Sequence, residues 1–243
     1  MRKFWLVWIA CAVPFAARAE TPACAPKDFG GETYVMCGFD LAHDDLRLNW
    51  RDAQAKPYGG FSALEAAMRA QGRKLRFAMN AGMYEENLAP VGLYIENGER
   101  LRRANTRDGH GNFHLKPNGV FWIGDGVAGV METSRFLAHP PTARFATQSG
   151  PMLVVDGRPH PKFQQESDSR KIRNGVCARG ARVWFAISDR PVTFYAFATL
   201  FRDSLGCVDA LFLDGSVSSL YAPELKRDDE LAPLGPIVSV TTP

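Results

Sequence analysis

Short apolar runs separated by turn residues constrain this chain more than any other feature. Nine runs of four to seven residues are rich in Val, Ile, Leu and aromatic side chains, which is typical of strands, whereas helices need longer periodic segments. The runs expected to form strands are 33–39, 46–50, 75–79, 91–96, 120–123, 152–156, 183–188, 210–213 and 237–240. An Asn-Gly pair at 97–98 predicts a hairpin after the fourth run, and the pairs at 118–119 and 156–157 predict further tight turns.

Two segments have the pattern of helices. A capping box at 62–65 predicts the start of a helix that continues through Ala70 and ends at Gly72. The second helix is predicted over 193–205, with phenylalanines along one face and Gly206 as its stop.

Many strands and two helices predict an α+β fold. A Rossmann fold is disfavoured because its helices would alternate with the strands. The sequence has no internal repeat, low-complexity tract or long linker. We therefore expect a single domain in which strand-rich, curved sheets pack against a few helices.

The N-terminal segment has the features of a signal peptide. Residues 1–19 begin with Arg2 and Lys3, continue with an apolar run over 4–15 and end in an A-x-A-like cleavage site at 17–19. An uncleaved anchor is the alternative, but the run is shorter than the roughly 20 residues that span a bilayer. Lipidation of Cys11 is a less favoured reading that would tether the protein. We expect residues 20–243 to form an exported, periplasmic domain without a transmembrane segment after cleavage.

The charge balance argues against nucleic acid as a partner. Of 29 Lys and Arg residues, three lie within 1–19, so 26 remain against 26 Asp and Glu residues. A formally neutral chain lacks the broad positive surface that binds nucleic acids or anionic membranes.

Four cysteines lie outside the N-terminal segment, and an even number in an exported chain indicates disulfides. Four cysteines allow three pairings. Pairing the nearest neighbours in sequence gives Cys24 with Cys37 and Cys177 with Cys207. Zinc ligation is the alternative, but no C-x-x-C pair or cysteine–histidine cluster supports it.

Familiar catalytic signatures are missing from the sequence, including G-x-S-x-G, H-E-x-x-H, the P-loop and G-x-G-x-x-G. The remaining candidates lie where polar residues and glycines border apolar strands. Asn80 and Gly82 follow one strand, where the amide suits sugar hydroxyls and the glycine allows close ligand approach, with an ordinary turn as the alternative. Gln148, Ser149 and Gly150 border another strand and are assigned to substrate binding with them.

Cations form the second group of candidates. Arg170 and Arg173 belong to a cluster of three cations in four positions, and the arginine fork suits phosphate or carboxylate. A solvated charged loop is the alternative. We expect Lys116, two residues before Asn118, either to bind the same anion or to be an exposed lysine of a hairpin. Asn118 is assigned to substrate binding. His114 is a candidate acid or base, although a strand residue with a satisfied ring is the commoner case.

The strand at 210–213 leads directly into Asp214, Gly215 and the hydroxyl of Ser218. A carboxylate at the end of a buried strand is held rigidly, which favours a general base, nucleophile or metal ligand over a free surface acid. An Asp that caps a turn is an equal alternative. Asn174, beside the cation cluster, is assigned to substrate binding.

Five segments, in this order, resemble the motifs of the phosphodiester glycosidase family: Asn80-Ala81-Gly82-Met83-Tyr84, Leu115-Lys116-Pro117-Asn118-Gly119-Val120-Phe121, Gln148-Ser149-Gly150-Pro151, Ser169-Arg170-Lys171-Ile172-Arg173-Asn174-Gly175 and Leu213-Asp214-Gly215 with Ser218-Ser219. The animal member of the family is the lysosomal uncovering enzyme, which removes N-acetylglucosamine from a mannose-6-phosphate diester. The resemblance spans Arg76 to Leu220. One departure is Ser216, which stands where the family usually has a second glycine, so a positive φ there would require the loop to adjust.

The resemblance implies an exported hydrolase that cleaves a sugar-phosphodiester or related anionic glycan linkage in the cell envelope. We expect Arg170 and Arg173 to hold the phosphate while Asn80 and Gln148 orient sugar hydroxyls. Asp214 would then activate water or stabilise the positively charged sugar of the transition state.

Two other functions stay open on the sequence alone. A non-catalytic glycan-binding protein of the envelope would use the same arginines and amides, and a metal-dependent phosphoesterase would cut the P–O bond. A divalent metal stays open as a cofactor because Asp214 alone is not a metal site. Glu85, Glu86, Asp168 and Asp189 have no assigned role.

Overall fold

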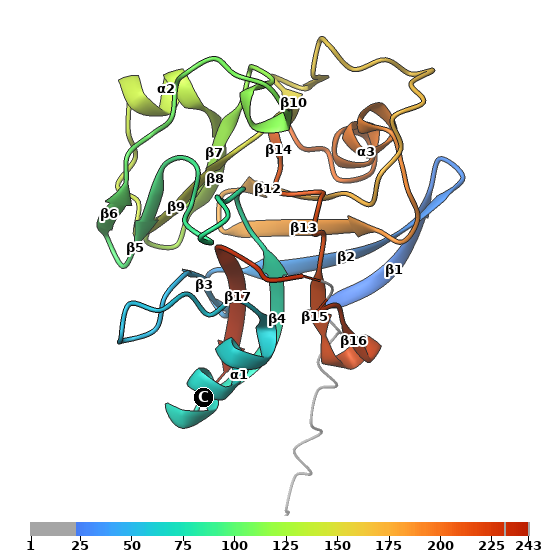
Figure 1. Cartoon of the computed structure of the whole chain (residues 1–243). Coiled ribbons are helices and arrows are strands. Elements are labelled where there is room, and N and C mark those ends of the chain that lie inside the picture. The colour runs from blue at the N-terminus through green and yellow to red at the C-terminus, as the bar shows by residue number, and fades with distance from the viewer. Residues whose placement is uncertain (1–22, 231, 243) are drawn as a thin grey trace, which may run out of the picture.

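The computed structural model describes residues 23–230 and 232–242, so the segment expected as a signal peptide, with Cys11, lies outside the described residues. The described chain forms three antiparallel sheets with three α-helices packed on them (Figure 1). This architecture is the strand-rich α+β fold that the sequence predicts. No helix within the described ranges has the length and apolar character needed to cross a membrane.

The first sheet has seven strands in the order β1-β2-β13-β12-β14-β10-β11. Its strands are β1 (Cys24–Phe29), β2 (Glu32–Asp40), β10 (Met152–Val155), β11 (Arg158–Pro159), β12 (Asn174–Arg179), β13 (Arg182–Ser188) and β14 (Ala210–Phe212). In β13, Val183, Phe185 and Ile187 face the main core, whereas Trp184 and Ala186 face the helix on the other side. This alternation follows from the two-residue period of a strand, and it explains an apolar run buried on both faces.

The second sheet has five strands in the order β16-β15-β4-β17-β3. Its strands are β3 (Asp45–Asn49), β4 (Lys74–Asn80), β15 (Leu220–Ala222), β16 (Arg227–Asp228) and β17 (Ile237–Thr242). Phe77 and Met79 of β4 point to the main core, and Leu75 and Ala78 pack under helix α1 (Phe61–Ala70). The central strand of this sheet therefore ends, at Asn80, deep inside the protein.

The third sheet has five strands in the order β6-β5-β9-β7-β8. Its strands are β5 (Tyr94–Glu96), β6 (Glu99–Arg102), β7 (Gly119–Ile123), β8 (Ala128–Glu132) and β9 (Phe145–Ser149). Helix α2 (Thr133–Ala138) packs Phe136 against Val120 and Ala146 on one face. Phe121 points from the other face into the main core.

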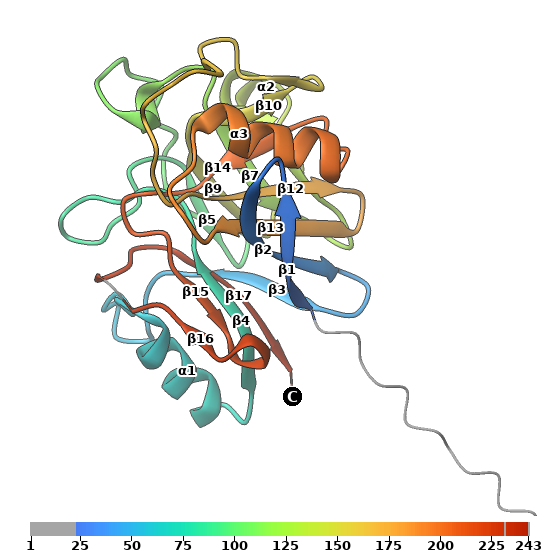
Figure 2. The ribbon, with the colours of Figure 1, turned by 90° about the vertical axis from the view of Figure 1, so that its right-hand side faces the viewer.

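Contacts among three phenylalanine rings join the three sheets. The rings of Phe77 and Phe185 are 5.1 Å apart between centroids, and those of Phe121 and Phe185 are 5.9 Å apart. Each ring comes from a different sheet and each is at most 1% exposed. Figure 2 shows the sheets from the side on which α3 (Phe194–Thr199) covers the first sheet and α1 the second.

Helix α1 begins differently from the prediction. Its N-cap is Gly60, which makes no side-chain cap, so the capping box predicted at Ser62 is wrong. The backbone N–H of Ser62 instead donates to the carboxylate of Glu230 at 2.6 Å, a long-range cap that also suits the positive end of the helix dipole. Gly72, with a φ of 72°, ends the helix as predicted.

The second predicted helix is confirmed with one refinement. Thr193 caps α3 by accepting a hydrogen bond from the N–H of Ala196, and the helix continues as a π-helical segment over Leu200–Ser204. Gly206 follows with a φ of 64°. Two single 3₁₀ turns, Asn112–His114 and Pro223–Leu225, complete the helical segments of the described chain.

The predicted turns are confirmed at two of three places. The pairs at 97–98 and 156–157 have positive φ throughout and connect β5 to β6 and β10 to β11. The turn predicted at 118–119 is wrong, because Gly119 already pairs in β7 with Ser149. Strand β5 is also shorter than predicted, since the side chain of Gln148 replaces a ladder bond by accepting from the N–H of Leu93 at 3.0 Å.

Both predicted disulfides are present. Cys24 and Cys37 are directly opposite residues of β1 and β2, and Cys177 in β12 is linked to Cys207 after the π-helical segment. The second bridge therefore ties helix α3 to the sheet beneath it.

The sequence separations, 13 and 30 residues, set the expected stabilities of the two bridges. A bridge restricts the unfolded chain more when it closes a longer loop. We expect Cys177→Ala with Cys207→Ala to lower the free energy of unfolding by about 3.6 kcal/mol, and by about 0.7 kcal/mol more than Cys24→Ala with Cys37→Ala. Urea denaturation of both double variants measures this, and the reverse ranking would contradict the explanation.

Candidate active site

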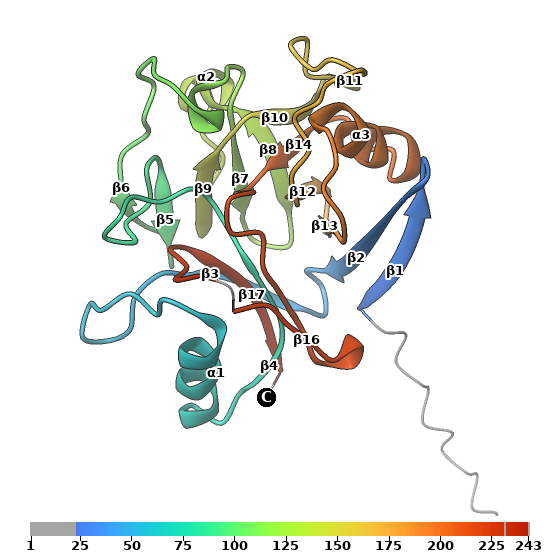
Figure 3. The same cartoon turned by 45° about the vertical axis from the view of Figure 1, so that its right-hand side comes forward.

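The candidate site lies where the chain crosses from the first sheet to the second. Strand β14 ends at Phe212 and β15 begins at Leu220, so the segment 213–219 joins the two sheets (Figure 3). This segment carries Asp214, and the adjoining ends of β4 and β12 carry Asn80 and Asn174. Residues from three distant parts of the sequence thus meet at one sheet junction.

Two buried amides hold the crossing segment in place. Asn80 donates from Nδ2 to the carbonyl of Asp214 at 2.9 Å and accepts at Oδ1 from the N–H of Ser219 at 2.8 Å. Asn174 donates to Asn80 Oδ1 at 2.9 Å and accepts from the N–H of Asp214 at 3.1 Å. Ser218 adds a bond from Oγ to the carbonyl of Asp214 at 3.2 Å. Both amides are at most 1% exposed, so in this structure they position the backbone of Asp214 rather than face solvent.

Burial gives Asp214 an unusual titration. The residue is 9% exposed, and burial raises the pKa of its carboxyl to about 6, although the N–H of Ser216, 3.0 Å from Oδ1, acts in the opposite direction. Burial and then the charge of Asp214 raise the pKa of Tyr84 to about 12. Both side chains line a hollow of about 470 Å³. The backbone at Ser216 has no positive φ, so the serine fits this loop without strain.

Arg173 is a buried cation without a buried anion. It is 1% exposed, its Nε donates to the carbonyl of Val192 at 2.9 Å, and its Nη2 donates to the carbonyl of Ser169 at 3.0 Å. The guanidinium lies 3.5 Å from the ring centroid of Phe194, a cation–π stack. Burial lowers its pKa to about 10, so it stays charged at neutral pH. Among the described residues, no carboxylate pairs with it.

The neighbouring arginines differ from Arg173 because they have acidic partners. Arg170 is half-exposed and pairs with Glu32, and Arg227 pairs with Asp189 at 2.7 Å. Arg170, Arg227 and Arg173 line one cavity of about 850 Å³. The cavity is thus lined by surface arginines that pair with carboxylates and by one buried arginine that has no carboxylate partner.

The cavity of Arg173 and the hollow of Asp214 adjoin each other. Asn112, Ser216 and Val217 line both, so the two form one continuous cleft. No ion pair joins Asp214 to Arg173 in the described part of the chain, and burial rather than a neighbouring cation dominates the pKa of Asp214. The structure therefore brings Asp214 and Arg173 to adjoining parts of one cleft.

The predicted glycines lie in close packing. A Cβ atom on Gly215 would approach the ring of Phe212 to 2.6 Å, and one on Gly150 would approach Cβ of Asn118 to 2.6 Å. A Cβ atom on Gly82 would collide with the hydroxyl of Thr147. These positions lack a side chain because neighbouring strands and loops leave no space for one.

The predicted amide Gln148 lies behind the cleft. It is 1% exposed and clamps Asn105, accepting from its N–H at 2.9 Å and donating to its carbonyl at 2.8 Å. The next residue, Ser149, is fully buried and donates to the carbonyl of Leu213. In this structure, Gln148 anchors the loop around Asn105, and Ser149 anchors the chain directly before Asp214.

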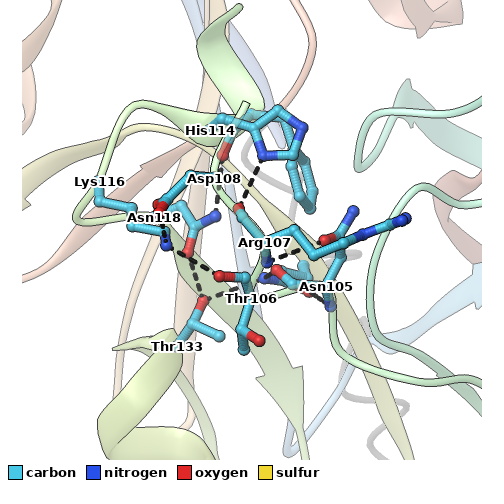
Figure 4. Close-up of polar contacts among 10 residues, drawn as sticks. Asn105, Thr106, Arg107, Asp108, His114, Lys116, Asn118 and Thr133 are labelled. Carbon is cyan, nitrogen blue, oxygen red and sulfur yellow. Dashed lines mark hydrogen bonds and ion pairs between the residues drawn. The ribbon is translucent and has the colours of Figure 1, made fainter. Parts of the chain in front are cut away.

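Lys116 and its neighbours fasten the same loop (Figure 4). Lys116 donates to the carbonyl of Thr106 at 2.8 Å and to Asp108 at 2.6 Å, and Nδ1 of His114 lies 3.0 Å from the carbonyl of Arg107. Asn118 is buried and donates to the carbonyl of Phe113 at 2.8 Å, and it accepts from the hydroxyl of Thr133 (Figure 4). The segments predicted around 116–118 and 148–150 thus support a wall of the cleft.

Several residues that form the cleft have no role that is predictable from the sequence. Tyr84 lies within the motif at 80–84, but its residue type alone assigns it no role. Asn112 begins a 3₁₀ turn that contacts the loop at Arg107 through His114. The sequence does not distinguish Arg227 or Phe194 as site residues. A charged surface segment explains the arginine equally well, and an amphipathic helix explains the phenylalanine. The described residues contain no cluster of three or more His, Cys, Asp or Glu side chains suited to a metal ion.

The fold and site together define a strand-rich α+β protein with a cationic cleft at the junction of two sheets. The family model for phosphodiester glycosidases matches residues 73–233. The uncharacterized protein YigE of Escherichia coli strain K12 is 36% identical over 208 residues, which cover 85% of this chain and 80% of that protein. The chain therefore belongs to the phosphodiester glycosidase family, as its motifs predict, and is a hydrolase of that type.

Solved structures share the fold. The catalytic domain of zebrafish N-acetylglucosamine-1-phosphodiester alpha-N-acetylglucosaminidase superimposes with a TM-score of 0.59 at 15% identity, covering 92% of this chain and 85% of that one. A protein from Synechocystis has a TM-score of 0.56 at 15% identity and covers 90% of this chain. This chain spans 61% of the length of the Synechocystis protein.

The positioning role of Asn174 can be separated from its contribution to stability. Asn174→Ala leaves the buried N–H of Asp214 without its partner and removes a hydrogen bond to Asn80. Asn49→Ala likewise removes the partner of the buried hydroxyl of Ser239, between β3 and β17. We expect each variant to lose about 2 kcal/mol of unfolding free energy. Only Asn174→Ala should also lose kcat, by about tenfold, because the carboxylate of Asp214 shifts. Urea denaturation and turnover of a sugar phosphodiester measure both effects, and equal kcat in the two variants would contradict the role.

Proposed function

We propose that the protein hydrolyses a sugar-1-phosphodiester, free or within an anionic glycan, in the cleft between Arg173 and Asp214. The single observation that carries this proposal is the buried, unpaired guanidinium of Arg173 on a cavity of about 850 Å³. A buried cation without a fixed anion is costly to the folded protein, so a ligand that supplies the anion is the natural partner.

Arg173 is suited to bind the phosphate group. Two of its nitrogens are held by carbonyl groups, and no described residue accepts a hydrogen bond from Nη1. A phosphate oxygen in the cavity would supply that acceptor and the missing negative charge. The exposed Lys171 lines the same cavity and would add positive charge to it, whereas Arg170 is paired with Glu32.

Asp214 is suited to act as general base. With a pKa of about 6, its carboxyl is mostly ionised at pH 7 and yet basic enough to take a proton. Water attacks the anomeric carbon and gives its proton to Asp214, and the bond between that carbon and the phosphate oxygen breaks. The phosphate monoester leaves with the bonding electron pair, and the sugar gains the hydroxyl group. Arg173 stabilises the charge that develops on the phosphate.

The sugar and the compartment are parts of the same proposal. The zebrafish enzyme acts on N-acetylglucosamine-1-phosphodiesters by its name, so that linkage is the first substrate to test. Two disulfides favour an oxidising compartment, and with the N-terminal pattern they support export to the periplasm.

Asp214→Asn tests the reaction directly. The amide cannot take a proton, so we expect kcat to fall by about 100-fold or more on N-acetylglucosamine-1-phosphate methyl diester. In the wild type, kcat/KM should rise with pH to a plateau above about 6, because only the ionised carboxylate is active. In water enriched in oxygen-18, the label should enter the sugar.

Four results would contradict this function. Unchanged turnover in Asp214→Asn would remove the proposed base, and a kcat/KM that falls as the pH rises through 6 would make the group an acid instead. Label in the phosphate would indicate cleavage of the P–O bond. Binding of the diester without turnover in every variant would indicate a glycan-binding protein.

A further inference from the structure

The cleft continues past Asp214, away from Arg173. The hollow of Asp214 shares Met83, Val91 and Asn112 with a second hollow of about 420 Å³. That hollow in turn shares Val91, Asn105 and Arg107 with a third, of about 570 Å³. The three hollows and the cavity of Arg173 therefore form one continuous groove.

The far end of this groove is lined by arginines. Arg102, Arg103 and Arg107 line the third hollow, and Arg107 also lines the second. Arg103 and Arg107 are exposed, and no described carboxylate pairs with either of them. Arg102 donates from Nε to the carbonyl of Pro90 at 3.2 Å. Like Arg173 at the other end, these side chains are not neutralised by the protein.

The middle of the groove carries the opposite charge. Asp214 lines the first hollow, and Glu85 and Asp108 line the second. Asp108 is paired with Lys116 at 2.6 Å, whereas Glu85 has no ion-pair partner in the described chain. Two cationic ends on either side of acidic side chains fit a ligand whose anionic groups are separated by an uncharged sugar.

The arginine end is also held in place. Gln148 clamps Asn105 through both backbone groups, and Lys116 clamps Thr106 and Asp108 (Figure 4). Arginines on a fastened loop lose less conformational freedom on binding than arginines on a free one. The clamp therefore favours a binding surface over a solvated charged segment.

We propose that the 102–107 segment forms a second anion subsite, so that the substrate is a polyanionic glycan with at least two phosphate or carboxylate groups. This inference rests on the proposed function and adds the substrate class to it. The scissile phosphate lies at Arg173, the sugar lies beside Asp214, and a further anionic group of the same chain lies at Arg103 and Arg107.

The test compares two probes on the intact protein. The short probe is N-acetylglucosamine-1-phosphate methyl diester, and the long probe is a trimer of the same sugar joined through 1-phosphodiesters. We expect the double variant Arg103→Ala with Arg107→Ala to lower the preference for the long probe, measured as the ratio of kcat/KM values, by about tenfold. The wild-type preference should also shrink with added salt, since exposed charges are screened.

Lys27→Ala with Lys74→Ala is the matched control. Both lysines are exposed and neither lines the groove, and Lys74 begins β4 at the end opposite Asn80. This variant removes the same number of charges and should keep the wild-type preference. An unchanged preference in the arginine variant would overturn the subsite, and so would an equal loss of preference in the control.

The outcome also separates this inference from the proposed function. If the wild type cleaves neither probe, the hydrolytic function fails, and calorimetric binding of the long probe decides on the subsite alone. Weaker binding by the arginine variant than by the control would support the subsite. Equal binding by the two variants would overturn it.

Discussion

The buried amide pair at the junction of two sheets is the interaction on which the site depends. At the ends of β4 and β12, the backbone N–H and carbonyl groups of the strands and of the crossing segment lie in an apolar interior. Leaving such groups without hydrogen bonds would be costly. Asn80 and Asn174 satisfy those groups by bonding to each other and to the backbone of Asp214. Fixing the backbone in this way also fixes a carboxylate, whose burial raises its pKa to about 6. The same hydrogen bonds therefore satisfy buried polar groups and position the carboxylate that we propose as the general base.

Arg173 differs from this amide pair, because the fold buries its charge without a neutralising carboxylate. Carbonyl groups and the ring of Phe194 surround it, and they lessen but do not remove the cost of desolvation. Proteins accept such costs where function requires a prepared electrostatic environment. The contrast with Arg170, which pairs with Glu32, shows that the uncompensated charge is a local feature of the cleft.

The sequence predicts those features that depend on neighbours along the chain. The hairpin at 97–98, the helix that starts near Thr193 and Asp214 directly after a strand are all local features, and all are present. Features that depend on the fold were not predictable. Nothing local shows that Glu230 caps α1, or that Gln148 points inward to fasten a loop instead of outward to a sugar. The family motifs indicate the right segments of the chain, but only the packing distinguishes residues that line the cleft from residues that support it.

The central claim is that the buried guanidinium of Arg173, which has no carboxylate partner, binds the anionic group of the ligand. Calorimetric titration with a non-hydrolysable phosphonate analogue of the diester tests this claim most directly, comparing Arg173→Met with Arg170→Met. We predict that Arg173→Met loses about 100-fold or more in affinity and stays at least as stable as the wild type in urea, because methionine removes the cost of a buried charge. Arg170→Met should bind nearly as well as the wild type. Wild-type affinity in Arg173→Met would contradict the account.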